Sequence, residues 1–432
     1  MTVILGLAQL LIISYITVFE YKRRSASVFL WATLLIMFGV MHMVSCLFDL
    51  QYSSSVLNVA SLFVIGFCLT YLLVRYVRFD EKSDRCNAVF DKTDSPYKNH
   101  RLLTIILIVV SVSMILNTAN MQGGLLNTSW SGARESSMYR PYVSSENIQG
   151  YLYAALAGVP LLCLISKEYI SALCGALAMF ALLIVTRNRV LMLPIFICII
   201  TYIIHVTNVK LTLQTIILGV LGASIILYIV YAVRAFRWMG SLQDALNNGS
   251  ISLINEMVRH SFQTDDGELG LRKYFYQFIS ADNSYQGFGK LSTYVRMLLV
   301  YIPTRFSFGL KPSDFAETMA LAVGGTSGGS IHPTLFGDCY ANCGSLGFLL
   351  GLLWGTLVNL IDLLIGRMPD IDSKRLAYVT AAFAFVVIGR GAVYNGFINI
   401  AWGFPIIYVI YIIRKINMSL TYKSHRHRKS RE

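Results

Sequence analysis

The segment between Arg296 and Asp338 concentrates side chains that could bind an anion and move a proton. Arg296, Arg305 and Lys311 come first, and a glycine-rich turn then leads to His332 and Asp338. A planar guanidinium group grips a phosphate at two points, whereas a lysine ammonium acts as a point charge. A neutral imidazole can remove a proton from a hydroxyl group near neutral pH. These residue types predict a site that holds an anionic substrate and activates a hydroxyl group.

Further arginines lie at the ends of apolar runs, where ionisable side chains are costly and often functional. The alternative for any one of them is that the guanidinium extends to a lipid phosphate while its stem stays in the apolar layer. The candidate anion-binding residues are Arg134, Arg140, Arg187, Arg189, Arg234, Arg237, Arg296, Arg305, Lys311 and Arg390.

The candidate base is His332, which Asp338 could orient unless this carboxylate is itself the base. Glu317 is a further candidate, as are Glu135 and Glu146. The alternative is a loop histidine that only bonds to backbone. Cys339 and Cys343 are four residues apart in an expected loop, and no further Cys or His completes a metal-site pattern. We therefore expect no metal and no cofactor.

The composition shows what scaffold must position these residues. Of 432 residues, 55% are hydrophobic and 14% are charged, and the mean hydropathy is +0.59. Soluble globular proteins carry about 25% charged residues, and disordered chains have low hydrophobicity. Both classes are excluded. Apolar runs near the roughly 20 residues that cross a bilayer as helix predict an all-α polytopic membrane protein.

We expect eleven transmembrane helices, with a large folded loop before the last three. The expected spans are 2–20, 28–48, 56–76, 102–118, 150–166, 169–186, 190–206, 211–233, 343–366, 375–393 and 396–413. The chain is thereby divided into spans 1–4 over 1–118, a smaller outer loop over 119–149, spans 5–8 over 150–233, the large outer loop over 234–342, spans 9–11 over 343–413 and a basic inner tail over 414–432.

The orientation follows from the basic segments, because lysine and arginine collect on the cytoplasmic side. Residues 22–24, the seven Lys or Arg of 75–101 and the tail fall on one side if the N-terminus is outside. Fourteen Lys and Arg remain on the outer side, and eleven of them are Arg. Residues 291–302 are apolar but too short to cross, so we expect them to lie in the membrane interface.

The order of motifs over about 290–350 resembles that of the Wzy-type polymerases, which assemble O-antigen and related repeat-unit polysaccharides. The residues that carry the resemblance are Arg296, Pro303-Thr304-Arg305, Lys311-Pro312, Gly324-Gly325-Thr326-Ser327, His332-Pro333-Thr334 and Gly337-Asp338-x-Tyr340-x-Asn342-x-Gly344. Members of this family commonly carry Glu where Asp338 stands. The rest of the chain matches only in architecture.

The resemblance implies a metal-independent glycosyltransferase of the bacterial inner membrane, with its active site facing the periplasm. It would move a growing glycan from undecaprenyl diphosphate onto the non-reducing end of a new lipid-linked repeat unit. The arginines would hold the diphosphate, and Arg134 and Arg140 could bind sugar or the phosphate of the second lipid. The implied partners are these lipid-linked oligosaccharides, membrane lipids and a separate protein that sets chain length.

Other functions stay open at this stage. An O-antigen ligase has the same general architecture and the same donor lipid. Metal-dependent transferases that use polyprenyl-phosphate sugars carry an acidic pair in the first outer loop, where this chain has only Asp49. A flippase or other transporter would need ionisable residues along a central path, and the spans offer only His42, His205 and Asp362.

The basic tail is interpreted as a topology anchor that attracts anionic lipid headgroups. Nucleic-acid binding would need a folded module, and we identify none in the sequence.

Overall fold

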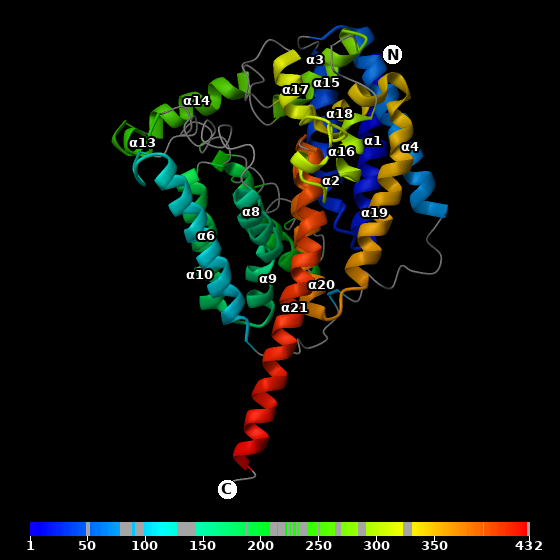
Figure 1. Ribbon diagram of the computed structural model, residues 1–432. Coiled ribbons are helices and arrows are strands. Elements are labelled where there is room, and N and C mark those ends of the chain that lie inside the picture. Colours follow the sequence, from blue (N-terminus) through cyan, green and yellow to red (C-terminus); the bar gives the residue numbers. More distant parts are fainter. Residues whose placement is uncertain are drawn as a thin grey trace.

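Every element that the computed structural model describes is a helix (Figure 1). The described residues are 1–48, 52–77, 89–90, 99–127, 144–186, 188–207, 240–248, 251–263, 269–283, 291–322, 331–391 and 393–429, with a few single positions between 214 and 232. Lipid offers the backbone no hydrogen-bond partner, so a crossing segment must satisfy its own polar groups, as a helix does.

The first half of the chain folds into helices that run back and forth along one bundle. They are α1 (Thr2–Lys22), α2 (Val28–Leu34), η1 (Leu35–Val40), α3 (Met41–Phe48), α4 (Ser54–Val77), α6 (Arg101–Met121), α8 (Ser144–Leu156), α9 (Val159–Ile165), α10 (Tyr169–Thr186), η2 (Arg189–Met192), α11 (Leu193–Thr201) and η3 (Tyr202–Val206).

The second half supplies short helices at the end of the bundle that holds the N-terminus, and then long helices again (Figure 1). The short ones are α13 (Leu242–Asn248), α14 (Ile251–Gln263), η4 (Leu269–Arg272), α15 (Lys273–Ser280), α16 (Ser292–Leu298), η5 (Thr304–Phe306) and α17 (Phe315–Ala322). They are followed by α18 (Thr334–Cys343), η6 (Gly344–Leu349), α19 (Leu350–Gly366), α20 (Ile371–Arg390) and α21 (Val393–Lys429).

Eight described helices are long and apolar enough to cross a membrane, which confirms an all-α membrane protein. They are Thr2–Lys22, Val28–Phe48, Ser54–Tyr76, Arg101–Met121, Ile148–Ile165, Tyr169–Thr186, Thr334–Gly366 and Val393–Asn417. The expected span 190–206 is a shorter apolar helix, and most of 211–233 lies outside the described residues. The expected span 375–393 corresponds to α20, which begins with charged residues.

The expected boundary of the ninth span is wrong. The chain is already helical at Thr334, and α18 joins α19 through the 3₁₀ turn η6 as one apolar segment. Leu335, Phe336 and Cys339 recur at helical spacing and are fully buried, and α18 packs against α15. Asp338, Cys339 and Cys343 therefore lie on a packed helix and not in a loop.

Helix α20 forms the centre of the bundle, with almost every residue from Leu376 to Gly389 buried. It packs against α2, α8, α11 and α21. Small residues allow this close approach: the Cα of Gly396 leaves room for the Ala384 carbonyl, which an added Cβ would meet at 2.6 Å. The central helix can therefore be surrounded on all sides without voids.

A buried ion network ties α1, α4 and α19 together. The guanidinium of Arg75 donates from Nε to Glu20 Oε1 at 2.8 Å and lies 3.0 Å from Asp362 Oδ2. Its other nitrogens bond to Glu20 Oε2 and to Asn359 Oδ1. The Tyr71 hydroxyl also donates to Glu20, at 2.9 Å. Two carboxylates thus share one cation in a site from which water is excluded.

This network corrects the expectation that the spans offer a transporter few ionisable residues. Glu20 and Arg75 lie at the ends of their expected spans, yet the fold buries both completely. Each of their charges has fixed partners, as Asp362 does through Ser25 at 2.8 Å. We interpret the network as a structural joint and not as a passage.

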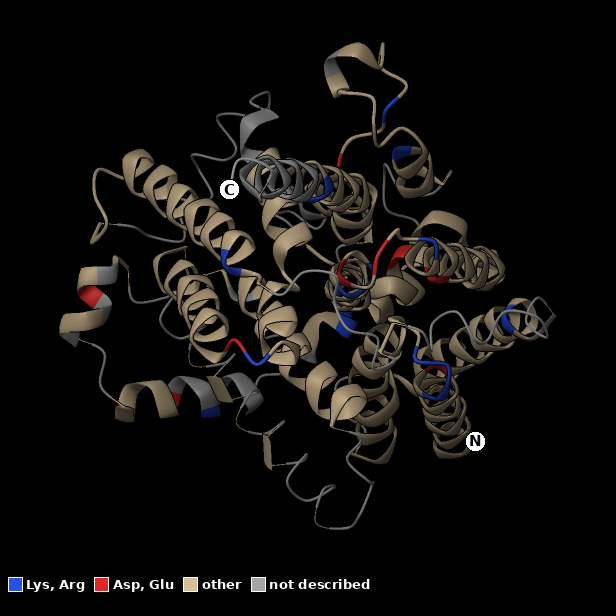
Figure 2. Ribbon diagram, turned by 90° about the horizontal axis from the view of Figure 1, so that it is seen from below, with Lys and Arg blue, Asp and Glu red and all other residues tan. Residues whose placement is uncertain are grey.

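A second buried cluster lies at the end of the bundle from which α21 extends (Figure 1). Asp372 Oδ2 accepts a hydrogen bond from Arg414 at 3.2 Å and lies 3.7 Å from His100 Nδ1. The backbone N–H of His100 donates to Glu168 at 2.9 Å. Viewed along this end, most of the ribbon is neutral, and the charged segments are few (Figure 2). The cluster fixes α20 and α21 to the start of α6.

We expect Arg75→Leu to lower the free energy of unfolding by about 3–5 kcal/mol, because it leaves two buried carboxylates without their cation. Thermal unfolding of the purified protein in detergent measures this loss. Arg101→Leu is the matched control, since Arg101 is exposed. Replacing Glu20, Arg75 and Asp362 together by leucine should recover most of the stability. Equal stability of Arg75→Leu and Arg101→Leu would contradict the role of the network.

Candidate functional site

The chain from Arg296 to Pro312 leaves the bundle and returns, and we call it the 296–312 hairpin. It follows α16, contains η5, and turns at Gly309, whose φ of +79° favours glycine. Two bonds close its neck: Arg296 Nη1 donates to the Pro312 carbonyl at 2.5 Å, and Lys311 Nζ donates to the Ile302 carbonyl at 2.8 Å. The hairpin is therefore a folded unit held by its own two cations.

Both neck cations approach the ring of Tyr394 in the first turn of α21. The guanidinium carbon of Arg296 lies 4.5 Å from the ring centroid, and Lys311 Nζ lies 5.9 Å from it. An aromatic face attracts cations at these distances. Tyr394 is 7% exposed, so it holds the two positive charges at a defined place against the bundle.

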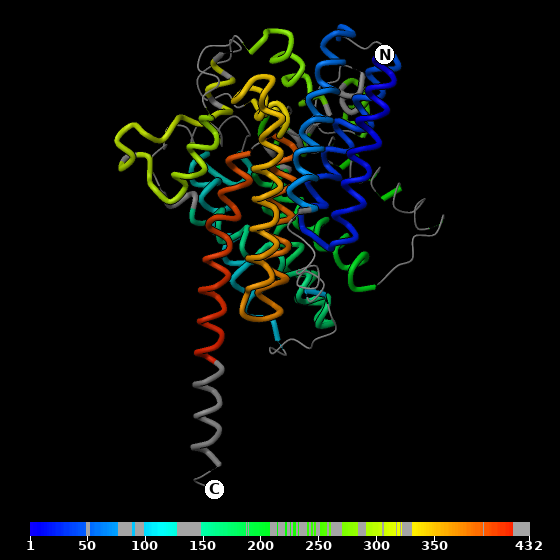
Figure 3. Tube along the Cα trace, turned by 90° about the vertical axis from the view of Figure 1, so that its right-hand side faces the viewer, coloured from blue at the N-terminus to red at the C-terminus, as the bar shows by residue number. Residues whose placement is uncertain are grey.

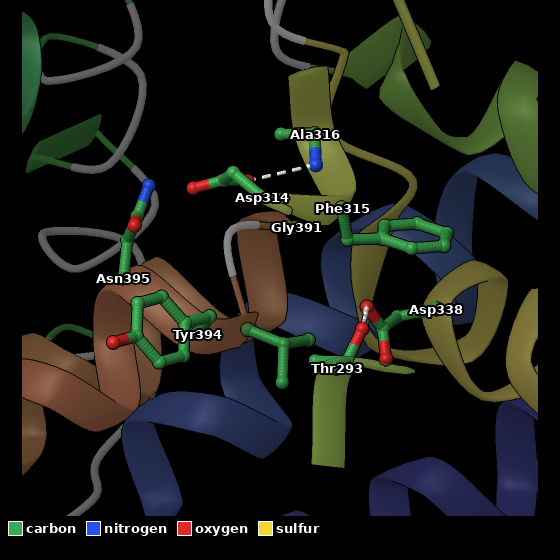
Figure 4. A pocket seen from close by; sticks show the side chains of 9 residues that line it. Thr293, Asp314, Phe315, Ala316, Asp338, Gly391, Tyr394 and Asn395 are labelled. Atoms are coloured by element: carbon green, nitrogen blue, oxygen red, sulfur yellow. Dashed lines mark hydrogen bonds between the residues drawn. The ribbon is translucent and has the colours of Figure 1, made fainter. Parts of the chain in front are cut away.

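A pocket opens beside this pair of cations (Figure 4). The outer segments and the turn between α20 and α21 contribute its walls, with carboxylate, hydroxyl, amide and aromatic groups around one space. Its lining residues are Thr293, Asp314, Phe315, Ala316, Asp338, Gly391, Val393, Tyr394 and Asn395. Positive charge at the margin and carboxylates in the wall suit an anionic substrate with a reacting hydroxyl group.

Asp338 is the most firmly held of the polar groups in the wall. The Thr293 hydroxyl donates to its Oδ2 at 2.9 Å, and the Asn342 amide donates to its Oδ1 at 3.1 Å. Asn342 also bonds to the Asp338 carbonyl at 2.8 Å, one turn back along α18. Asp338 is 2% exposed, so its position is set by α16 and α18 together.

The second carboxylate of the pocket, Asp314, is held locally. Its Oδ1 accepts a hydrogen bond from the Ala316 backbone at 2.9 Å, as a residue before a helix commonly does. It therefore orders the start of α17, and it reaches the pocket from the side opposite Asp338 in Figure 4. Among the described residues, no three His, Cys, Asp or Glu side chains are grouped closely enough to hold a metal ion.

Gly391 brings His332 to the margin of the pocket. Its φ is +131°, and an added Cβ would meet the Thr334 nitrogen at 2.6 Å and the His332 Cβ at 2.9 Å. Only glycine allows the turn between α20 and α21 to pass so close to the start of α18. The same turn places half-buried Arg390 next to the pocket in sequence.

Four of the predicted site residues are thus brought together: Arg296, Lys311, His332 and Asp338. Arg390 ends α20 beside Gly391. Arg305, Glu317 and Arg189 lie on η5, α17 and η2, but their side chains lie outside the described part of the structure. The described residues do not include Arg134, Arg140, Arg187, Arg234 and Arg237.

The sequence analysis missed Tyr394, Asn395, Asp314 and Thr293. The available signal was weak: Tyr394 and Asn395 are an aromatic and an amide residue at the start of an otherwise apolar run, and Asp314 follows Pro312. Their common role emerges only because three separate segments meet at one place.

The charge on Lys311 should be lost at a lower pH than that of an ordinary lysine. Burial, and then the nearby charge of Arg296, lower the pKa of Lys311. The ammonium form attracts an anion, so affinity for a diphosphate lipid should fall as pH rises toward that lowered pKa. Lys311→Arg should abolish this fall, because arginine keeps its charge. Comparing the two proteins from neutral to alkaline pH cancels ionisation of the ligand, and identical curves would exclude the role of Lys311.

Comparison with known proteins adds no constraint on this geometry. No protein family, no curated protein and no solved structure matches the chain. The chemistry of the pocket and of the two cations beside it must therefore carry any assignment of function.

Proposed function

We propose that this protein polymerises lipid-linked oligosaccharide repeat units, of O-antigen or a related surface polysaccharide. The observation that carries the proposal is the convergence of Arg296 and Lys311 on Tyr394 beside the pocket that Asp338 lines. Two cations suit a diphosphate leaving group, and an adjacent carboxylate suits activation of an acceptor hydroxyl. The membrane-spanning architecture suits substrates that are anchored in lipid.

The proposed reaction transfers the growing glycan from undecaprenyl diphosphate to the non-reducing end of a new lipid-linked unit. A base takes the proton of the acceptor hydroxyl as its oxygen attacks the anomeric carbon of the donor. The bond from that carbon to the diphosphate oxygen breaks, and undecaprenyl diphosphate leaves with both electrons of the bond. Arg296 and Lys311 stabilise the negative charge that develops there, as preorganised cations do in a site of low dielectric.

Asp338 is the candidate base that lines the pocket, and His332 is the alternative at its margin. Thr293 and Asn342 donate to both carboxylate oxygens and so fix the direction in which Asp338 can accept a proton. Glu317 remains a further candidate. We propose that Arg305, Arg390 and the arginines at 134, 140, 187, 189, 234 and 237 bind the second lipid or its sugars.

The proposal includes eleven spans in a bacterial inner membrane, with the N-terminus and the pocket on the periplasmic side. The basic tail that α21 carries away from the bundle would then lie in the cytoplasm (Figure 1). This orientation is supported by the accumulation of Lys and Arg at that end. A chain-length-regulating protein would be a partner on the periplasmic side.

Surface polysaccharide from a deletion strain tests the function directly. We expect a gel ladder to collapse to the core with one repeat unit, and the wild-type gene to restore it. Arg296→Ala should fail to restore the ladder, because the diphosphate loses one of its two cations. Arg259→Ala is the matched control, since Arg259 is exposed on α14.

Two outcomes would contradict the polymerase. If capped core disappears and lipid-linked polymer accumulates, the protein is an O-antigen ligase. If single repeat units accumulate on lipid at the cytoplasmic face, it is a transporter.

A purified system separates the two candidate bases. Loss of a general base lowers the rate by about 10²–10⁴-fold, so we expect Asp338→Asn to lower the polymerisation rate within that range. The asparagine keeps the size of the side chain and an acceptor for Asn342. Asp314→Asn is the control from the opposite wall, and we expect a change of less than about tenfold, because that carboxylate only orders a helix start. If His332→Ala shows the large loss and Asp338→Asn does not, the assignment to Asp338 is wrong.

A further inference from the structure

The tip of the 296–312 hairpin exposes apolar side chains that the chemistry of the pocket does not use. Phe308 is 93% exposed, Leu298 is 83% exposed and Leu310 is 72% exposed. Tyr301 and Phe306 are more than half exposed on the same hairpin. Exposed apolar residues gathered in one segment mark a surface for lipid or for a partner.

The hairpin lies along the side of the bundle and not above it. The Tyr301 hydroxyl donates to the carbonyl of Ala401 at 2.7 Å, and its ring packs edge-on against Trp402 at 5.2 Å. Ala401 lies eight residues into α21, or about 12 Å along the helix axis. In Figure 3 the same segment projects sideways at the level of α1 and α4. The apolar tip is therefore at the depth of the membrane-spanning helices.

The neck of the hairpin has the opposite chemistry. Arg296 and Lys311 sit at its two ends, meet over Tyr394, and border the pocket. One side of this unit is cationic and faces the pocket, while the other is apolar and faces the space beside the bundle. This is the pattern that an amphiphile with an anionic head and a long apolar chain would match.

We propose, on the basis of the proposed function, that the 296–312 hairpin binds the isoprenoid chain of the lipid-linked substrate while its neck holds the diphosphate. The site commits to this lipid because its two cations adjoin the pocket, where the diphosphate carries the reacting sugar. The chain then leaves the pocket sideways along Leu298, Phe308 and Leu310. The hairpin thereby fixes the depth at which the anomeric carbon meets Asp338.

Photo-crosslinking from the hairpin tests this binding site without requiring turnover. A benzophenone amino acid replaces Phe308 in the full chain in phospholipid nanodiscs, and undecaprenyl diphosphate is the probe. We expect crosslinks to the probe in several-fold excess over its share of the lipid. The matched control places the benzophenone at Ile170, which is 81% exposed at the start of α10 beside the inner cluster. There the crosslinks should follow the lipid composition.

Chain-length dependence supplies a second, independent measurement. Leu298→Ser with Phe308→Ser should weaken binding of undecaprenyl diphosphate about tenfold, which corresponds to about 1.4 kcal/mol of lost contact. Binding of a diphosphate with a single isoprene unit should be unchanged, because it reaches only the neck. Both residues are exposed, so these substitutions leave the packed core intact.

Three outcomes are informative. Crosslinks from position 308 that only follow the phospholipid composition would overturn the inference and leave an ordinary lipid-facing loop. Equal weakening for the long and the short diphosphate would also overturn it. If the hairpin binds the long chain but the purified protein forms no polymer, the proposed function fails while the lipid site stands, since binding is measured without turnover.

Discussion

The guanidinium of Arg75 is shared by two buried carboxylates, and the arrangement of α1, α4 and α19 depends on that sharing. In the membrane interior no water is present to solvate a charge, so a carboxylate left alone there is costly. Glu20 and Asp362 come from opposite halves of the sequence, and Arg75 can serve both only if all three helices meet at one depth. The constraint also sets the start of α19, and through η6 the place of α18, which carries Asp338 into the pocket wall.

The opposite end of the bundle uses weaker and more numerous contacts. Segments between the long helices fold back into the bundle: α15 packs against α4 and α18, and its Tyr276 hydroxyl bonds to His42 at 2.6 Å. The turn between α20 and α21 passes against His332 because Gly391 has no side chain. The pocket is thus built where one connection of the bundle, one outer helix and the start of α18 meet. The hairpin adds a cationic neck and an apolar tip to the same place.

Much of the site could be predicted from residue types alone. The expectation that Arg296, Lys311, His332 and Asp338 act together depended on their order in one segment, and the structure places all four around one pocket. Asp338 was expected in a loop, but a helix carries it, because Leu335, Phe336 and Cys339 bury the same segment against α15. Tyr394 escaped prediction because nothing in a lone tyrosine at a helix start distinguishes a cation-binding ring from an interfacial one.

The sequence by itself determined that this chain is an all-helical membrane protein and where most of its helices lie. Those properties are local, because crossing lipid requires about 20 apolar residues and an internally bonded backbone. Only the tertiary structure decided which charges are buried in pairs and which residues share a pocket. Glu20 and Arg75 are 55 positions apart, and Thr293, Asp338 and Tyr394 come from three separate helices. Such meetings depend on how helices pack, and side-chain shape and the need to pair buried charge decide that packing after the helices have formed.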